Sequence, residues 1–89
     1  MKKICVVRTY SAGVHIGEFV SRAGREVTLA NARRIWSWEG ALSLHEVATR
    51  GITGGKISVP IGEILLLEAI EVLTSSEEVL ANIARFEVK

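Results

Sequence analysis

The fold is decided by residues 14–30, which read VHIGEFVSRAGREVTLA. Over Val14–Val20 and again over Arg25–Ala30, apolar and polar residues alternate with the period of a half-buried β-strand. In the first strand, Val14, Ile16, Glu18 and Val20 would face one way and His15, Gly17 and Phe19 the other. The short Arg22-Ala23-Gly24 segment between the strands ends in glycine, which accepts backbone angles that other residues avoid. We therefore expect two antiparallel strands joined by a tight turn.

Working outward, the flanking segments extend this sheet on both sides. Lys3–Thr9 contains the β-branched run Ile4–Val7 and precedes the turn Ser11-Ala12-Gly13, so it predicts a strand that completes an antiparallel meander. Asn31–Trp38 predicts a fourth strand, which Gly40 ends. On that strand Arg34, Trp36 and Trp38 would share one face, and Arg33, Ile35 and Ser37 the other.

Two helices are indicated by their caps. Ser43 with Glu46 three residues later fits a capping box, and Gly51 ends that short helix. Ser75 and Ser76 precede two glutamates that favour the positive end of a helix dipole. The buried stripe of this C-terminal helix would be Val79, Leu80, Ile83 and Ala84.

The segment between the helices is the hardest to assign. Gly54-Gly55 predicts a turn and Lys56–Val59 a short strand closed by Pro60. Glu63–Thr74 has apolar residues at even positions, which favours a strand, but the spacing of Glu68 and Glu71 leaves a helix open. The expected fold is a single α+β domain over residues 1–89. It has an antiparallel sheet of about five or six strands, with a short central helix and a C-terminal helix packed on one face.

Composition narrows the class of protein. The chain has 89 residues, 48% of them hydrophobic, and a mean hydropathy of +0.30. So small a domain has little interior, so we expect part of the apolar content to lie between subunits of a homo-oligomer. The longest aliphatic run, Ile64–Leu67, is too short to span a membrane. Lys2 and Lys3 followed by only Ile4–Val7 do not make a signal peptide, and one cysteine suits a reducing compartment, so we expect a cytoplasmic protein.

Charge is unevenly distributed although the net charge is only +1. Residues 1–56 carry nine Lys or Arg and four Glu, a balance of +5, whereas residues 57–89 carry two and six, a balance of −4. This asymmetry fits head-to-tail association or an anion site in the first half, and it equally fits scattered solvated charges.

Several chemistries can be tested against the sequence, and none fits. Gly55-Lys56 lacks the first glycine and the hydroxyl residue of a phosphate-binding P-loop, whose places hold Arg50 and Ile57. His15 and His45 are 30 residues apart, so no metal-ligand spacing is visible. Cys5 lies in an aliphatic strand, which predicts a buried core thiol. We therefore expect no catalytic residues, no metal and no cofactor, and a protein that is not an enzyme.

Two segments have the composition of a binding surface. In the first, Arg8-Thr9-Tyr10-Ser11-Ala12-Gly13, Arg8 could fork onto a phosphate and Tyr10 could stack on a base, while Ser11 and the turn around Gly13 could donate hydrogen bonds. The alternative is a hairpin end with an exposed Arg8 and with Tyr10 packed at its rim.

The second segment, Asn31–Trp38, holds both tryptophans and two arginines. Arg33 and Arg34 are candidates for phosphate binding, and Trp36 and Trp38 for base stacking. Because strand alternation separates the two arginines, at most one of them joins the tryptophans. The alternative is that one or both tryptophans anchor the core.

At these segments the chain resembles a family of small uncharacterised proteins of tailed phages and prophages. The resemblance rests on RTYSAGV at 8–14 and NARRIW at 31–36, continuing through Trp38, Gly40-Ala41, Ser43-Leu44 and Gly51. A cysteine-containing loop expected near Gly54-Gly55-Lys56 is missing. The resemblance implies a cytoplasmic accessory protein outside the virion. By analogy with small phage proteins that sequester cyclic nucleotide messengers of bacterial immunity, it implies stoichiometric binding.

The leading hypothesis is therefore a homo-oligomer that binds a phosphate-bearing nucleotide to block host defence. The alternative is a protein-interaction module that inhibits a host protein or joins a phage complex, because Trp, Tyr and Arg also dominate protein hot spots. A third hypothesis is a small messenger hydrolase using His15 or His45 with a glutamate. DNA is the least favoured partner, because the net charge is small and no helix is rich in Lys or Arg.

Overall fold

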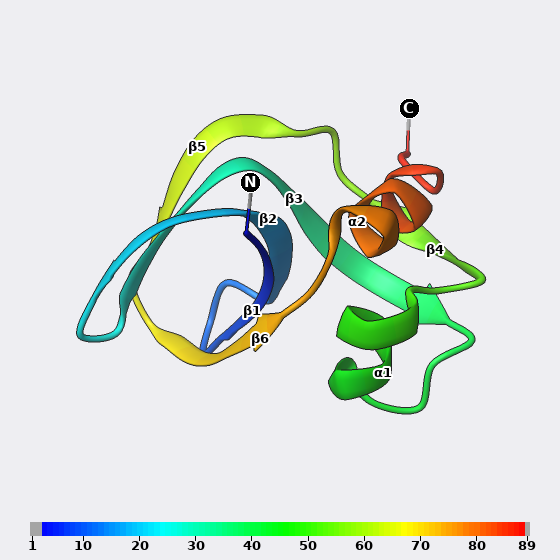
Figure 1. Cartoon of the computed structure of the whole chain (residues 1–89), viewed down its shortest axis with the longest axis horizontal. Helices are drawn as coiled ribbons and strands as arrows, with labels where there is room; N and C mark the ends of the chain where they lie inside the picture. Colours follow the sequence, from blue (N-terminus) through cyan, green and yellow to red (C-terminus); the bar gives the residue numbers. More distant parts are fainter. Residues whose placement is uncertain (1–2, 89) are drawn as a thin grey trace.

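The computed structural model describes residues 3–88, which form six strands and two helices (Figure 1). The fold is α+β, as predicted. In chain order the elements are β1 (Ile4–Thr9), β2 (Val14–Ala23), β3 (Glu26–Glu39), α1 (Leu44–Arg50), β4 (Gly54–Ile57), β5 (Ile61–Leu66), β6 (Ala69–Thr74) and α2 (Glu77–Ala84).

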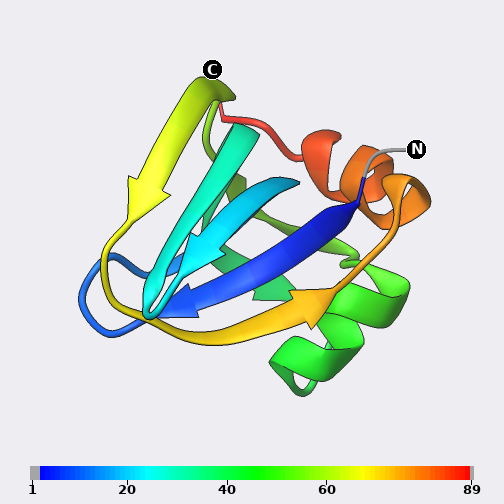
Figure 2. The same ribbon diagram turned by 60° about the vertical axis from the view of Figure 1, so that its left-hand side comes forward.

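All strands belong to one antiparallel sheet in the order β4-β3-β2-β1-β6. The long β3 has two partners on the same side: Ile35–Glu39 pairs with β4, and Val27–Ala32 pairs with β5. β5 and β6 lie at opposite edges of the sheet, yet only residues 67 and 68 separate them in the chain. The sheet must therefore curl to bring its edges together, and Figures 1 and 2 show the strands wrapped around a common interior.

Curling gives the sheet two buried faces. One, the helix face, is covered by α1 and α2 and buries Ile4, Val6, Ile16, Ile35 and Ile57, among others, against Val47 and Ile83 of the helices. The other, the inner face, lies inside the curl and buries Cys5, Val7, Val27, Leu29, Ala32 and Leu66. β1 is thus buried on both sides, which explains why its sequence is continuously apolar rather than alternating.

The helices lie on one face of the sheet, as predicted, and begin and end where their caps indicate. The Ser43 hydroxyl accepts a hydrogen bond from the Glu46 N–H, and the Ser76 hydroxyl accepts one from the Val79 N–H. Gly51 ends α1 with φ of +85°, a conformation that favours glycine. Neither helix in the described part, residues 3–88, has the length and apolar character needed to cross a lipid bilayer.

The predicted third and fourth strands are one continuous strand, β3. The boundary expected at Ala30/Asn31 is a bulge, where Asn31 adopts φ of +49° and the pairing with β2 shifts by one residue. Asparagine tolerates this left-handed conformation better than most residues. A second bulge, at Val20 of β2, shifts the pairing again and leaves Val20 exposed instead of beside Val14 and Ile16.

Two predictions between the helices were wrong in detail. Gly54-Gly55 is not a turn but the start of β4, where Gly55 pairs with Trp38. A side chain at Gly55 would meet the backbone of Ser37, so the close strand approach explains the glycine. Glu63–Thr74 is extended as favoured, with no helix, but Leu67 and Glu68 divide it into β5 and β6.

Candidate ligand-binding site

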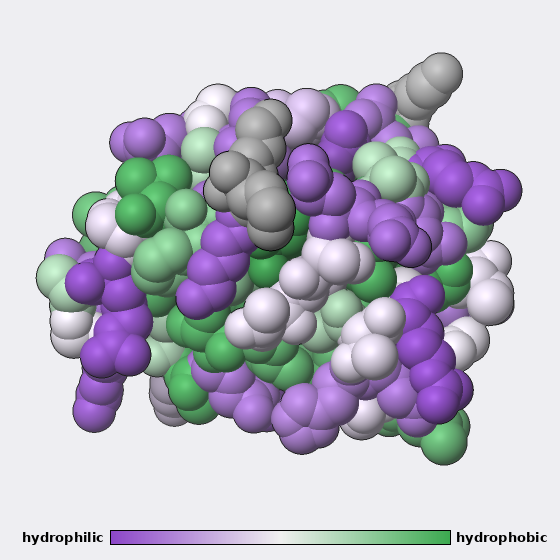
Figure 3. Space-filling view, viewed as in Figure 1, coloured by the Kyte–Doolittle hydropathy of each residue, from purple (hydrophilic) through white to green (hydrophobic). Residues whose placement is uncertain are grey.

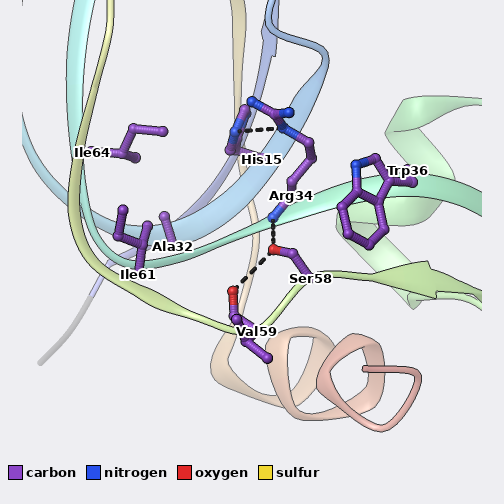
Figure 4. A pocket seen from close by; sticks show the side chains of 8 residues that line it. All are labelled: His15, Ala32, Arg34, Trp36, Ser58, Val59, Ile61 and Ile64. Atoms are coloured by element: carbon purple, nitrogen blue, oxygen red, sulfur yellow. Dashed lines mark hydrogen bonds between the residues drawn. The ribbon is translucent and has the colours of Figure 1, made fainter. Parts of the chain in front are cut away.

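A cavity of about 210 Å³ opens beside the inner face, at the point where β3 changes partners (Figure 4). β2 contributes His15, and β3 contributes Ala32, Arg34 and Trp36. The opposite wall comes from the segment between β4 and β5 and from β5 itself, with Ser58, Val59, Ile61 and Ile64.

The cavity exists because the chain crosses from β4 to β5 over residues 58–60. Ser58 holds this crossing to β3: its N–H donates to the Arg34 carbonyl at 3.0 Å, and its hydroxyl accepts from the Arg34 N–H at 2.8 Å. Beyond Ser58 the chain leaves β3 until Ile61 pairs with Ala32. The side chains of this part of β3 therefore have no strand beside them and border an open space.

A bulge at Trp36 determines which side chains reach the cavity. Ile35 pairs with Ile57 and Ser37 pairs with Lys56, so Trp36 is the extra residue on β3. After the bulge the alternation is reversed: Trp38 packs against the helix-face core, as Ile35 does. The prediction that Trp36 and Trp38 share one face is therefore wrong. The prediction that Arg34 and Trp36 lie on the same side of the strand is confirmed, since both line the cavity.

Arg34 and His15 form the polar centre of the cavity. They are cross-strand partners, and the Arg34 Nε–H donates to His15 Nε2 at 3.4 Å (Figure 4). His15 is only 2% exposed, and burial together with the positive charge of Arg34 lowers its pKa to about 4. The imidazole is neutral at pH 7, and because arginine can only donate, the ring proton lies on Nδ1.

Hydrogen-bonding capacity remains unused at this centre. Within residues 3–88, His15 Nδ1 is buried without a partner, and no carboxylate pairs with the Arg34 guanidinium. A buried unpaired N–H is costly, so an acceptor that reached Nδ1 through a turn of the imidazole would gain more here than at a solvated site. The centre therefore holds a charged donor, Arg34, and a neutral donor, the buried Nδ1–H of His15.

Trp36 stands at the mouth of the cavity with 57% of its surface exposed. The remaining wall is aliphatic, from Val59, Ile61 and Ile64. An exposed indole beside a guanidinium is suited to a planar ligand that carries negative charge, because the ring stacks and the cation neutralises.

The first predicted segment reaches a neighbouring cavity of about 210 Å³. Thr9, Ser11 and Ala12 line it on one side and residues 64–68 on the other, so the two cavities share Ile64. The Ser11 hydroxyl donates to the Glu68 carboxylate at 3.0 Å. Figure 2 shows the β1–β2 turn lying beside the chain that follows β5. The structure thus brings Ser11 to the same part of the molecule as Arg34 and Trp36.

The β1–β2 turn is less open than predicted. The N–H groups of Tyr10 and Ala12 already donate to the Glu68 carbonyl and the Thr9 hydroxyl. Gly13, with φ of +80°, directs its carbonyl to the N–H and hydroxyl of Thr9. Tyr10 is 73% exposed and lines neither cavity.

The other candidate residues lie elsewhere. Arg8 pairs with Val14, which packs on the helix face, and its side chain contacts Glu71 at 3.4 Å. Arg33 binds the Glu87 carboxylate at 2.6 Å and borders a separate hollow against α2. The Trp38 indole donates to the Ala41 carbonyl at 3.3 Å and supports the core, as the alternative interpretation expected.

Sequence reasoning did not assign His15, Ser58 or Glu68 to the leading binding site. His15 was considered only as a structural or catalytic histidine. The signal that would have found it is the pairing of β2 with β3, since a strand continuing past Asn31 sets Arg34 opposite His15. Ser58 and Glu68 follow from the crossing of β4 to β5 and the two-residue link to β6, which local patterns do not reveal.

Comparison with known proteins gives a family but no activity. No curated protein and no solved structure matches this chain significantly. A family model described as a domain of unknown function, DUF6948, matches residues 2–83. That match covers all six strands and most of α2, and with them every residue of the cavity at Arg34. The chain therefore belongs to the DUF6948 family.

Proposed function

We propose that this protein binds a small planar ligand that carries phosphate, with a nucleotide as the chemical class that fits best. The observation that carries the proposal is one cavity lined by Arg34, by the His15 imidazole, whose Nδ1–H is buried without a partner, and by the exposed Trp36 ring. Each supplies a different part of nucleotide recognition: a cation, a neutral donor and a stacking surface.

The polar centre favours phosphate over a single carboxylate. Phosphate has enough acceptor oxygens to take two hydrogen bonds from the Arg34 fork and to offer a third oxygen to His15 Nδ1–H once the imidazole turns toward the ligand. Its negative charge would also raise the pKa of His15 toward its usual range, so binding and protonation would support each other.

Sequestration is the biological role that we propose for this binding. The resemblance to phage accessory proteins suggests a host cytoplasmic setting in which the ligand is a cyclic nucleotide messenger of bacterial immunity. Stoichiometric binding needs no catalytic group. Self-association would suit the exposed apolar residues near β5, and Figure 3 shows apolar surface gathered on the side where β5 and the β2–β3 hairpin lie.

The test is native mass spectrometry with a panel of cyclic and linear nucleotides, followed by calorimetric titration of each nucleotide that adds mass. We expect Arg34→Ala to weaken binding by at least tenfold. The matched control is Arg8→Ala, which removes an arginine of similar exposure outside the cavity and should leave binding unchanged. Equal binding by wild type and Arg34→Ala, with unchanged circular dichroism, would overturn the proposal.

A protein partner is the second candidate, and one observation favours it. β5 and β6 are sheet edges, and together with the link between them they expose Ile61, Leu65, Leu67 and Ile70. Exposed apolar edge strands pair readily with another chain. Light scattering separates the possibilities: a dimer that Leu67→Glu dissociates assigns this surface to a second copy. A monomer that captures one host protein in stoichiometric amount, and loses it with Leu67→Glu, supports the interaction module.

A further inference from the structure

We infer that the ligand extends past its phosphate into the cavity at Ser11 and Glu68 and presents hydroxyl groups there. The group bound at Arg34 is then esterified at both of its ends, as the diphosphate is in a nucleoside diphosphate sugar or the phosphodiester is in a dinucleotide. This inference rests on the proposed function and narrows its ligand class. The starting observation is that the two cavities share Ile64 as a common wall.

The register of the strands makes the two cavities neighbours. Val7 pairs with His15, and Thr9 lies two residues further along β1 on the same face. Such a diagonal pair of an antiparallel sheet is about 7–8 Å apart. Thr9 lines the second cavity and His15 lines the first. A ligand phosphate at His15 is therefore within one sugar unit of Thr9.

Along the two neighbouring cavities, an aromatic, a cationic and an acidic group follow one another in a fixed order. Trp36 lies at one end, two residues along β3 from Arg34. Arg34 and His15 form the centre, and the Ser11 hydroxyl with the Glu68 carboxylate forms the other end. A ligand that satisfies all three parts has a planar group, then phosphate, then a polar group beyond the phosphate.

Charge decides what that last group is. Within the described residues 3–88, Ser11 is the one hydrogen-bond donor to the Glu68 carboxylate, which leaves acceptor positions on an exposed side chain. A carboxylate accepts hydrogen bonds from vicinal hydroxyls but repels a second phosphate. The distal group is therefore a neutral polyol such as ribose or a hexose.

The experiment compares each nucleoside diphosphate with its sugar ester: ADP with ADP-ribose, UDP with UDP-glucose and GDP with GDP-mannose. Because the free diphosphates carry more negative charge, attraction to Arg34 alone would make them the tighter ligands. We expect at least one sugar ester to bind at least tenfold more tightly than its free diphosphate in calorimetric titrations at neutral pH.

Glu68→Gln tests the distal end directly. It should lower the preference for the sugar ester by at least fivefold while leaving the affinity for the free diphosphate unchanged. Glu63→Gln is the matched control, since Glu63 is an exposed carboxylate on β5 that lines neither cavity. This control should keep the full preference.

The outcomes separate the two proposals. If the diphosphates bind as tightly as their sugar esters and Arg34→Ala weakens both, the extended ligand is overturned and the nucleotide site stands. A preference that Glu68→Gln leaves intact also overturns the assignment of the distal end. If no member of any pair binds and the cyclic nucleotides of the panel add no mass either, the nucleotide site fails together with the inference built on it.

Discussion

The Arg34 Nε–H points at Nε2 of His15 across 3.4 Å, so a cation sets the tautomer of a buried histidine. The usual partner of a buried histidine is a carboxylate or a carbonyl oxygen, which accepts a hydrogen bond from the ring N–H. Here the partner donates, and protonation of His15 would place two N–H groups face to face. The structure therefore contains a histidine that resists protonation.

Stability should depend on pH through His15. Its pKa is lowered from 6.5 to about 4 by burial and by Arg34, so the folded state binds its proton less readily than the unfolded chain does. The stabilisation is complete above pH 6.5 and is lost as pH falls toward 4. Across this window the free energy of unfolding should fall by up to about 1.4 kcal/mol per pH unit.

Urea denaturation at pH 7, 6 and 5 measures this effect, and His15→Gln supplies the comparison. The variant should be less pH-dependent than the wild type over this range, because glutamine does not titrate. If the free energy of unfolding falls equally with pH in both proteins, His15 is not the group that causes the loss of stability in acid.

Truncating the two tryptophans should affect the free energy of unfolding to very different extents. Trp36 is mostly exposed, so Trp36→Ala should change the free energy of unfolding by less than about 0.5 kcal/mol and should abolish ligand-induced fluorescence quenching. Trp38 packs against the core, so Trp38→Ala should cost about 3 kcal/mol. Urea denaturation followed by circular dichroism measures both. A larger loss for Trp36→Ala than for Trp38→Ala would contradict the placement of the bulge.

Gly17 should not tolerate a side chain. A Cβ there would lie 3.0 Å from the Ala30 carbonyl oxygen and from Ala32 Cα, both backbone atoms. We expect Gly17→Ala to destabilise the fold by about 1–3 kcal/mol. Gly62→Ala is the control, because nothing lies within 4 Å of its Cβ position and its φ is unstrained. Thermal denaturation of the pair should separate them clearly.

The ion pair between Arg33 and Glu87 fastens the residues after α2 to β3. Its 2.6 Å contact is largely shielded, with 16% and 27% of the two side chains exposed, and Arg33 also donates to the Ser58 carbonyl at 3.2 Å. Arg33→Ala should cost about 1.5–3 kcal/mol, as expected for a hydrogen bond to a charged group. A double-mutant cycle with Glu87→Gln, read by urea denaturation, gives the coupling. A coupling near zero would mean that the pair is only a surface contact.

Cys5 should be unreactive in the folded protein. The thiol is fully buried, and burial raises its pKa against the opposing positive charge of Lys3. Labelling with a disulfide reagent at pH 8 should be slow in buffer and complete within minutes in 6 M guanidinium. Rapid labelling of the folded protein would show that β1 opens.

Local patterns predicted the strands at the start of the chain, both helices and their caps. They succeeded where each segment follows its own period, as in Val14–Phe19, or carries its own cap, as at Ser43 and Ser76. They also placed Arg34 and Trp36 on the same side of the strand, as the cavity lining shows, because the alternation reverses only after Trp36.

The failures come from relationships between strands. Asn31 and Trp36 are extra residues only when β3 is set against its partners, so alternation within β3 could not reveal them. The same holds for His15 as a site residue, whose role depends on the strand opposite. Glu68 reaches Ser11 across 57 residues of chain, and only the curl of the sheet brings them together.

The extra residue at Trp36 also has an evolutionary consequence. Removing one codon at this position would erase the bulge while keeping the number of paired residues in β3 and β4 unchanged. Trp38, which packs against the helix-face core, would keep its pairing with Gly55. The surface would lose the exposed Trp36 ring in a single genetic event. A one-residue insertion or deletion can therefore add or remove the exposed indole beside Arg34 without rebuilding the scaffold that carries it.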